Sequence, residues 1–115
     1  MSLERGDIAL VNFPHSDLRT IKLRPVVVVQ ADDLQTGIPQ LIVAMISSRL
    51  DRAPHPSRVL VRLTDVGATE TGLRTDSVIM SDNLATIRLM LINKVIGRLR
   101  DMSTVDRTLR KTLAL

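Results

Sequence analysis

The feature that most constrains the fold of this 115-residue chain is Arg24-Pro25 followed by four valines at 26–29. Valine is stiff about χ1 and favours a strand over a helix, and an unbroken apolar run indicates burial on both faces. Pro25 lacks an N–H group and biases Arg24 toward an extended backbone. We therefore expect a buried strand over residues 24–31 that begins at Arg24. Its guanidinium would lie at the rim of the sheet, where it could bind an anion or simply face solvent.

Other short segments with strand character follow, separated by turn-rich loops. Segment 40–47 is almost entirely apolar, which predicts a central strand, whereas the alternation over 58–63 predicts a half-exposed one. Residues 85–99 are ambiguous, with two strand-like pieces and a possible helical turn at 89–93 between them. Further strands are expected at residues 6–12 and 76–80.

The C-terminal segment predicts the one clear helix. Ser103 is a suitable N-cap, and Val105, Leu109 and Leu113 recur at the i, i+4, i+8 spacing of an amphipathic helix. Several short strands with one closing helix predict a mainly β (α+β) fold, either a strongly curved sheet or a partly open small barrel. The length fits one domain over residues 1–115.

Composition narrows the function further. Thirteen Arg and three Lys give a net charge of +4, which favours a polyanionic partner such as nucleic acid. Phe13 is the sole aromatic residue, which argues against recognition by base stacking. The absence of cysteine excludes disulfides and thiolate metal sites. No apolar run reaches 18 residues and the N-terminus lacks a signal-like apolar region, so we expect a cytoplasmic protein that does not enter a membrane.

The sequence contains no recognisable metal or cofactor motif. His15 and His55 are forty residues apart, and no zinc-binding, phosphate-loop, dinucleotide or nucleophile-elbow pattern is present. We therefore expect neither a metal nor a cofactor. What remains is binding alone, or acid–base chemistry by a few polar side chains.

Polar residues stand at three expected strand ends. They are Arg24, the Ser47-Ser48-Arg49 segment and the Ser81-Asp82-Asn83 segment. If these ends converge, an arginine could stabilise charge on a phosphate, a serine could hydrogen-bond it, and a carboxylate could accept a 2′-hydroxyl proton. Both serine-containing segments can also be read as ordinary turns, so the pattern alone does not decide whether the three strand ends converge.

Several short motifs, spread in order along nearly the whole chain, carry a resemblance to a known family. Each motif is weak alone, but their shared order is specific. They read R-G-D-I at 5–8, F-P-x-x-D-L at 13–18, K-L-R-P-V-V-V-V at 22–29, I-S-S at 46–48, G-L-x-x-D-S-V-I at 72–79, D-N-L-x-T-I at 82–87 and I-G-R-L at 96–99. In this pattern the chain resembles the MazF/PemK family of toxin endoribonucleases from type II toxin–antitoxin systems.

The resemblance implies an SH3-like barrel of the CcdB/MazF type with a C-terminal helix, acting as a homodimer. It implies sequence-selective, metal-independent and ribosome-independent cleavage of single-stranded mRNA. It also implies a short, acidic, partly disordered antitoxin that covers the RNA surface, folds on binding and joins the toxin in binding DNA. Arg24 and Ser47 match catalytic positions, and Asp82 matches an acidic position used in some members. The residues expected to contact RNA are His15, Arg19, Lys22, Ser48, Arg49, Asn83 and Thr86.

The chain also departs from the family pattern. Many members carry Glu-Gln in the loop before the R-P pair, whereas residues 17–22 read D-L-R-T-I-K. Where some members have R-T-I-D, this chain has Ala85 and Arg88 at the first and last positions. Two alternatives therefore stay open: a non-catalytic RNA- or protein-binding barrel, and a gyrase poison of the CcdB type. The C-terminus lacks the aromatic residue with which CcdB-type toxins typically end.

Overall fold

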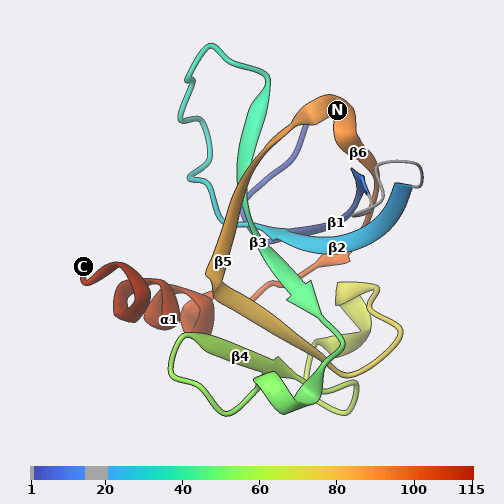
Figure 1. Ribbon diagram of the computed structural model, residues 1–115, viewed down its shortest axis with the longest axis vertical. Coiled ribbons are helices and arrows are strands. Elements are labelled where there is room, and N and C mark those ends of the chain that lie inside the picture. The colour runs from blue at the N-terminus through green and yellow to red at the C-terminus, as the bar shows by residue number, and fades with distance from the viewer. Residues whose placement is uncertain (1, 15–20) are drawn as a thin grey trace.

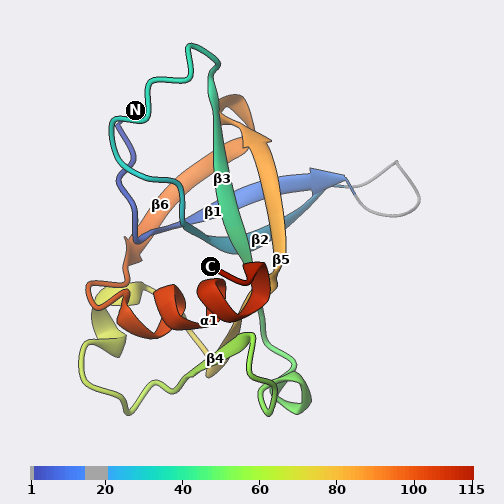
Figure 2. The ribbon, with the colours of Figure 1, turned by 90° about the vertical axis from the view of Figure 1, so that its left-hand side faces the viewer.

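A computed structural model describes residues 2–14 and 21–115, which form one six-stranded antiparallel sheet and one α-helix. The strand order is β4-β5-β3-β2-β1-β6, and the sheet coils strongly upon itself (Figure 1). Turned by 90°, the molecule shows α1 lying across the sheet above β4 (Figure 2). The elements are β1 (Asp7–Pro14), β2 (Ile21–Val28), β3 (Gln40–Ser47), β4 (Arg58–Val61), β5 (Ser77–Arg88), β6 (Ile92–Arg98), α1 (Ser103–Leu113) and the 3-10 turns η1 (Leu50–Arg52), η2 (Ala68–Thr71) and η3 (Leu89–Leu91).

The valine run is buried on both faces of β2, as its sequence predicts. Val26 and Val28 belong to one apolar cluster, together with Val43. Val27 points the other way and packs in a second cluster with Ile79, on the side covered by α1. Because side chains alternate along a strand, these three consecutive valines pack into two apolar clusters, one on each face of the sheet. β3, which lies between β2 and β5, has the central position expected for it.

The predicted start of β2 was wrong. The strand begins at Ile21 and ends at Val28, so Arg24 lies inside it, opposite Val11 of β1. β3 pairs with β2 only from Val26 onward, which leaves the other edge of β2 open at Pro25. A proline is tolerated at an open strand edge because no ladder hydrogen bond is lost there.

β5 is longer than the expected strand at 76–80. It runs for 12 residues and contains an irregularity opposite β3, where Met45 pairs with Met80 but Ala44 pairs with Leu84. Residues 81–83 therefore have no partner on β3. A bulge of this kind bends a strand without ending it, so the polar segment that looked like a turn is part of β5. The helical turn expected near 89–93 is present as η3.

Helix α1 is confirmed, with a shifted N-cap. Met102 occupies the cap position, and the backbone N–H of Ser103 is bound by Asp101 Oδ1 at 3.0 Å. Val105 is fully buried, whereas Leu113 is 50% exposed at the far end of the helix. Leu109 packs against the same core as Val105, as its spacing predicts, and buried Thr108 adds to that contact, whereas Leu113 does not.

Thr108 provides a test of the contact between the helix and the sheet. Its Oγ1 donates to the Val105 carbonyl at 2.9 Å and lies 2.7 Å from the buried Ser81 Oγ. Thr108→Val should lower the free energy of unfolding by about 1–3 kcal/mol, because the Ser81 hydroxyl loses its acceptor. Adding Ser81→Ala should restore part of that loss, since no buried hydroxyl then stays unpaired. Urea unfolding of both variants measures this, and strictly additive losses would contradict it.

Within residues 2–14 and 21–115, no helix has both the length and the apolar character needed to cross a membrane.

Candidate nucleic-acid interface

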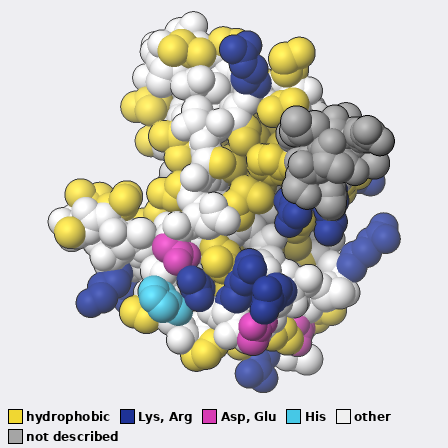
Figure 3. Space-filling view, viewed as in Figure 1, with side chains coloured by type: hydrophobic (Ala, Val, Ile, Leu, Met, Phe, Trp, Pro, Cys, Tyr) yellow, Lys and Arg dark blue, Asp and Glu magenta, His cyan; other side chains and the backbone are white. Residues whose placement is uncertain are grey.

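A groove of about 1090 Å³ lies over β2, β1 and β6, between the end of β3 and the loop that precedes β5. Its floor is partly apolar and its rim is cationic. Figure 3 shows Lys and Arg side chains gathered on this face. The groove is lined by Leu10, residues 22–25, 46–49, Arg52, residues 72–75, Ser77 and residues 93–96.

Arg24 and Ser47 both line this groove. The β2–β3 ladder pairs Val28 with Val43, Val27 with Ala44 and Val26 with Met45. The ladder ends at this last pair. Beyond it, β2 carries the Arg24 guanidinium and β3 carries the Ser47 hydroxyl to the same groove, although the two residues are far apart in sequence.

The Ser47 hydroxyl is held in a defined orientation. Its Oγ accepts the backbone N–H of Arg49 at 3.1 Å, a local turn of the kind serine favours after a strand. No acceptor for the Ser47 O–H is found in the part of the chain that the structure describes. The hydroxyl is therefore able to donate to an oxygen atom of a bound ligand.

The groove collects cations from separate parts of the chain. Lys22, Arg24 and Arg49 were expected from the sequence, whereas Arg52, Arg74 and Lys94 were not. No acidic side chain is among the described residues that line it. Arg49 has a partner in Asp51 at 2.9 Å, but both side chains are more than 60% exposed, so this pair is weak and exchangeable. A cleft lined by one sign of charge attracts a polyanion.

The wall that carries Arg74 is fixed by a glycine. Gly72 has φ +73°, in the left-handed region, and a Cβ there would collide with the backbone carbonyl of Ile96 on β6. The loop backbone can approach β6 this closely only because position 72 has no side chain. This contact sets the position of the loop that forms one side of the groove.

Asp82 is not among the described residues that line the groove. It lies in the β5 bulge and forms an ion pair with Arg58 of β4, with Nη2 and Oδ2 2.9 Å apart. Hydrogen bonding from Arg58 holds the pKa of Asp82 below its usual value, so this carboxylate is a weaker base than a free aspartate. Of the three strand-end positions expected to converge, Arg24 and the Ser47 segment line this groove, whereas Asp82 does not.

The residues predicted to contact RNA fall into three groups. Lys22, Ser48 and Arg49 line the groove, whereas Asn83 and Thr86 are exposed on β5 outside its lining. His15 and Arg19 lie outside the described residues. The missed cations Arg52, Arg74 and Lys94 had only one signal in the sequence, the net positive charge, because each comes from a different loop or strand.

The described part of the chain offers no cluster of three or more His, Asp or Glu side chains suited to hold a metal ion. The charged and hydroxyl groups that line the groove include guanidinium groups, ammonium groups and serine hydroxyls. These groups bind phosphate and stabilise negative charge that develops on it.

Comparison with known proteins places this architecture in context. A family model described as PemK-like, MazF-like toxin of type II toxin–antitoxin system matches residues 4–113. Endoribonuclease EndoA of Bacillus subtilis (strain 168) is 31% identical over 118 residues, an alignment that covers 100% of this chain and 97% of that protein.

Solved structures share the fold. An endoribonuclease in complex with its cognate antitoxin, from a mycobacterial species, has a TM-score of 0.77 at 16% identity, covering 99% of this chain and 97% of that one. The Mycobacterium tuberculosis toxin MazF-mt6 has a TM-score of 0.73 at 21% identity, covering 95% and 97%. With its sequence matched almost end to end and its fold shared with these structures, the chain belongs to the family of PemK-like, MazF-like toxins of type II toxin–antitoxin systems.

Proposed function

We propose that this toxin is an endoribonuclease that cuts single-stranded mRNA in the cationic groove, selectively for short sequences and without a ribosome or a metal ion. The observation that carries the proposal is the groove itself, which brings Arg24 and Ser47 together among six cations. The relative named endoribonuclease EndoA supports the reaction type. Such a toxin would act in the cytoplasm as a single domain over residues 1–115.

The proposed reaction is an internal displacement at phosphorus. The ribose 2′-oxygen bonds to the adjacent phosphorus while the bond from phosphorus to the 5′-oxygen breaks. The proton of the 2′-hydroxyl passes to solvent water, and the departing 5′-oxygen takes a proton from water. The products are a 2′,3′-cyclic phosphate and a 5′-hydroxyl. The Arg24 guanidinium stabilises the charge that builds on the non-bridging oxygens, and the Ser47 O–H donates to one of them. Lys22, Ser48 and the other groove cations hold the flanking phosphates.

The sequence suggests Asp82, or another group, for proton transfer. The ion pair with Arg58 and the position outside the groove lining favour a different role for Asp82. The proposed catalytic set in the groove is therefore Arg24 and Ser47. Their contribution is electrostatic stabilisation of the transition state, which is often the largest single term in catalysis.

The same surface fits a protein partner. We propose that the acidic, disordered segment of a cognate antitoxin occupies the groove, because six cations around a partly apolar floor suit an acidic peptide with apolar anchors. A solved relative is described in complex with its cognate antitoxin. We further expect a homodimer in which the RNA path continues from one groove to that of the second copy.

The proposal is tested with purified toxin, single-stranded RNA and excess EDTA. We expect cleavage to products that end in a cyclic phosphate and begin with a 5′-hydroxyl. A matched RNA with a single 2′-deoxynucleotide at the cut site should stay intact there, because the nucleophile is missing. Cleavage of the deoxy substrate at the same site, or a requirement for added metal, would contradict the mechanism. Tight RNA binding without any cleavage would instead support the non-catalytic alternative.

A further inference from the structure

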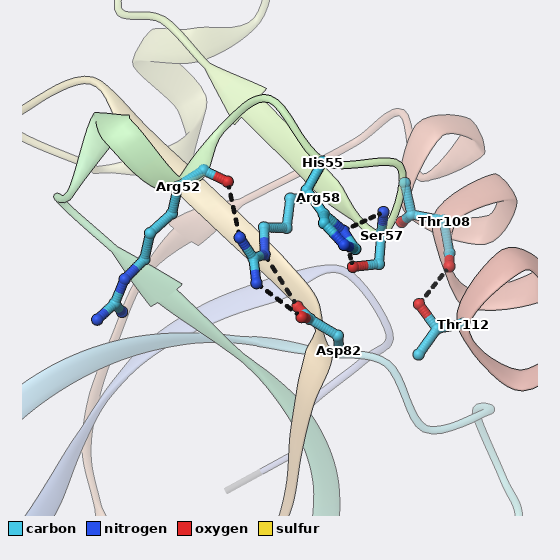
Figure 4. Close-up of polar contacts among 7 residues, drawn as sticks. All are labelled: Arg52, His55, Ser57, Arg58, Asp82, Thr108 and Thr112. Carbon is cyan, nitrogen blue, oxygen red and sulfur yellow. Dashed lines mark hydrogen bonds and ion pairs between the residues drawn. The ribbon is translucent and has the colours of Figure 1, made fainter.

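A second polar cluster lies directly behind one wall of the groove. Arg58 of β4 directs all three nitrogens of its guanidinium at acceptors (Figure 4). Nε and Nη2 donate to the two carboxylate oxygens of Asp82 at 3.3 and 2.9 Å. Nη1 donates to the backbone carbonyl of Arg52 at 3.1 Å. The cluster thus joins β4, β5 and the 3-10 turn η1.

The sheet geometry explains why Asp82 faces Arg58. Arg58 pairs with Met80 across the β4–β5 ladder, so Asp82 is its diagonal neighbour two residues along β5. Ser81, in the bulge, turns its side chain inward to Thr108 of α1, and the next residue along the strand faces the opposite side. Diagonal pairs on one face are within reach of long side chains such as arginine.

The third contact of Arg58 reaches the wall of the groove. The Arg52 carbonyl stands at the C-terminal end of η1, where carbonyls lack partners within the helix and a cation is favourable. In Figure 4 this carbonyl faces Arg58, whereas the Arg52 side chain extends away from the ion pair. Arg49, which precedes η1, and Arg52, the last residue of η1, both line the groove, and neither Arg58 nor Asp82 does.

We propose that Asp82 and Arg58 are positioning residues. Their ion pair anchors the Arg52 carbonyl and thereby holds η1 so that the side chains of Arg49 and Arg52 face the phosphates of bound RNA. This inference rests on the proposed function of the groove and replaces the catalytic role that the sequence suggested for Asp82. The lowered pKa of Asp82 keeps it ionised and bound to Arg58. The Asp82 side chain is 29% exposed and that of Arg58 22%, so neither is sealed in the core.

The test compares Asp82→Asn and Arg58→Met with a matched control, Asp106→Asn. The control breaks an Arg5–Asp106 pair of 2.7 Å and similar exposure, on α1 and away from the groove. A misplaced phosphate-binding wall weakens substrate binding in ground state and transition state alike. We therefore expect both variants to raise KM by roughly 3- to 10-fold with kcat within about twofold, and the double variant to be no worse than either single one.

A second measurement is independent of RNA. Hydrogen exchange should quicken at residues 49–53 in Asp82→Asn and stay unchanged there in Asp106→Asn. A kcat loss of roughly 100-fold in Asp82→Asn with Arg58→Met close to wild type would overturn the proposal, since a proton acceptor behaves that way. An unchanged KM in both variants would overturn it as well.

The two proposals fail differently. If the wild-type protein cleaves no RNA, the proposed function of the groove is wrong. Amide hydrogen exchange at residues 49–53 still decides whether the ion pair between Asp82 and Arg58 holds η1. Should Arg58→Met fold poorly, Arg58→Lys keeps the charge but loses the planar fork, and an intermediate KM is then expected.

Discussion

Arg24→Ala is expected to slow RNA cleavage by roughly 100- to 1000-fold, the loss seen when one preorganised donor to a developing oxyanion is removed. The reason is geometric as well as electrostatic. Arg24 is exposed, lines the groove and is carried by a strand whose following valines are buried in two apolar clusters. Its backbone therefore needs little reorganisation when charge appears on the phosphate. Single-turnover kinetics with a defined RNA oligonucleotide measures the effect.

Two further variants make that experiment decisive. Arg24→Lys should recover only part of the rate, because an ammonium group cannot present two parallel donors to a phosphate. Arg107→Ala removes an exposed arginine of α1 outside the groove and should leave the rate unchanged. The Arg24→Ala protein should keep its thermal stability, since the side chain is exposed. Equal cleavage by wild type and Arg24→Ala would remove Arg24 from the catalytic set.

Binding of a single strand should weaken steeply with salt. Affinity for single-stranded nucleic acid falls with a slope of about −0.7 per neutralised phosphate on a log–log plot. Six cations line the groove. If about four to six phosphates are neutralised, the slope is roughly −3 to −4, and affinity falls about 50- to 300-fold between 50 and 200 mM salt. Fluorescence anisotropy with an uncleavable 2′-deoxy oligonucleotide measures this.

Single replacements locate the effect within the groove. Arg74→Ser should reduce the magnitude of the slope by about 0.7, because one phosphate contact is lost. Arg110→Ser, on the exposed side of α1, removes the same charge from the protein and should leave the slope unchanged. A slope that responds equally to both variants would mean that net charge, and not the groove, drives binding.

Much of the local structure follows from the sequence because its causes are local. The valine run predicts a strand buried on both sides, since β-branching and the two-residue period act within a few residues. The apolar spacing of residues 105–113 likewise predicts α1. Strand ends were predicted less well. Pro25 suggested the start of a strand but lies inside β2. A proline is tolerated at this position because β3 pairs with β2 only from Val26 onward, which the sequence does not reveal.

The sequence alone was sufficient to single out Arg24 and Ser47 as candidate site residues and, through ordered motifs, to identify the toxin family. Only the tertiary structure decided how these residues meet. β2 and β3 carry Arg24 and Ser47 to one groove, and Arg52, Arg74 and Lys94 line it from three other segments. The same structure removes Asp82 from the groove and pairs it with Arg58, because a bulge extends β5 past the apparent turn. Periodicity and motif spacing describe neighbours along the chain, whereas these contacts depend on strand pairing between distant segments.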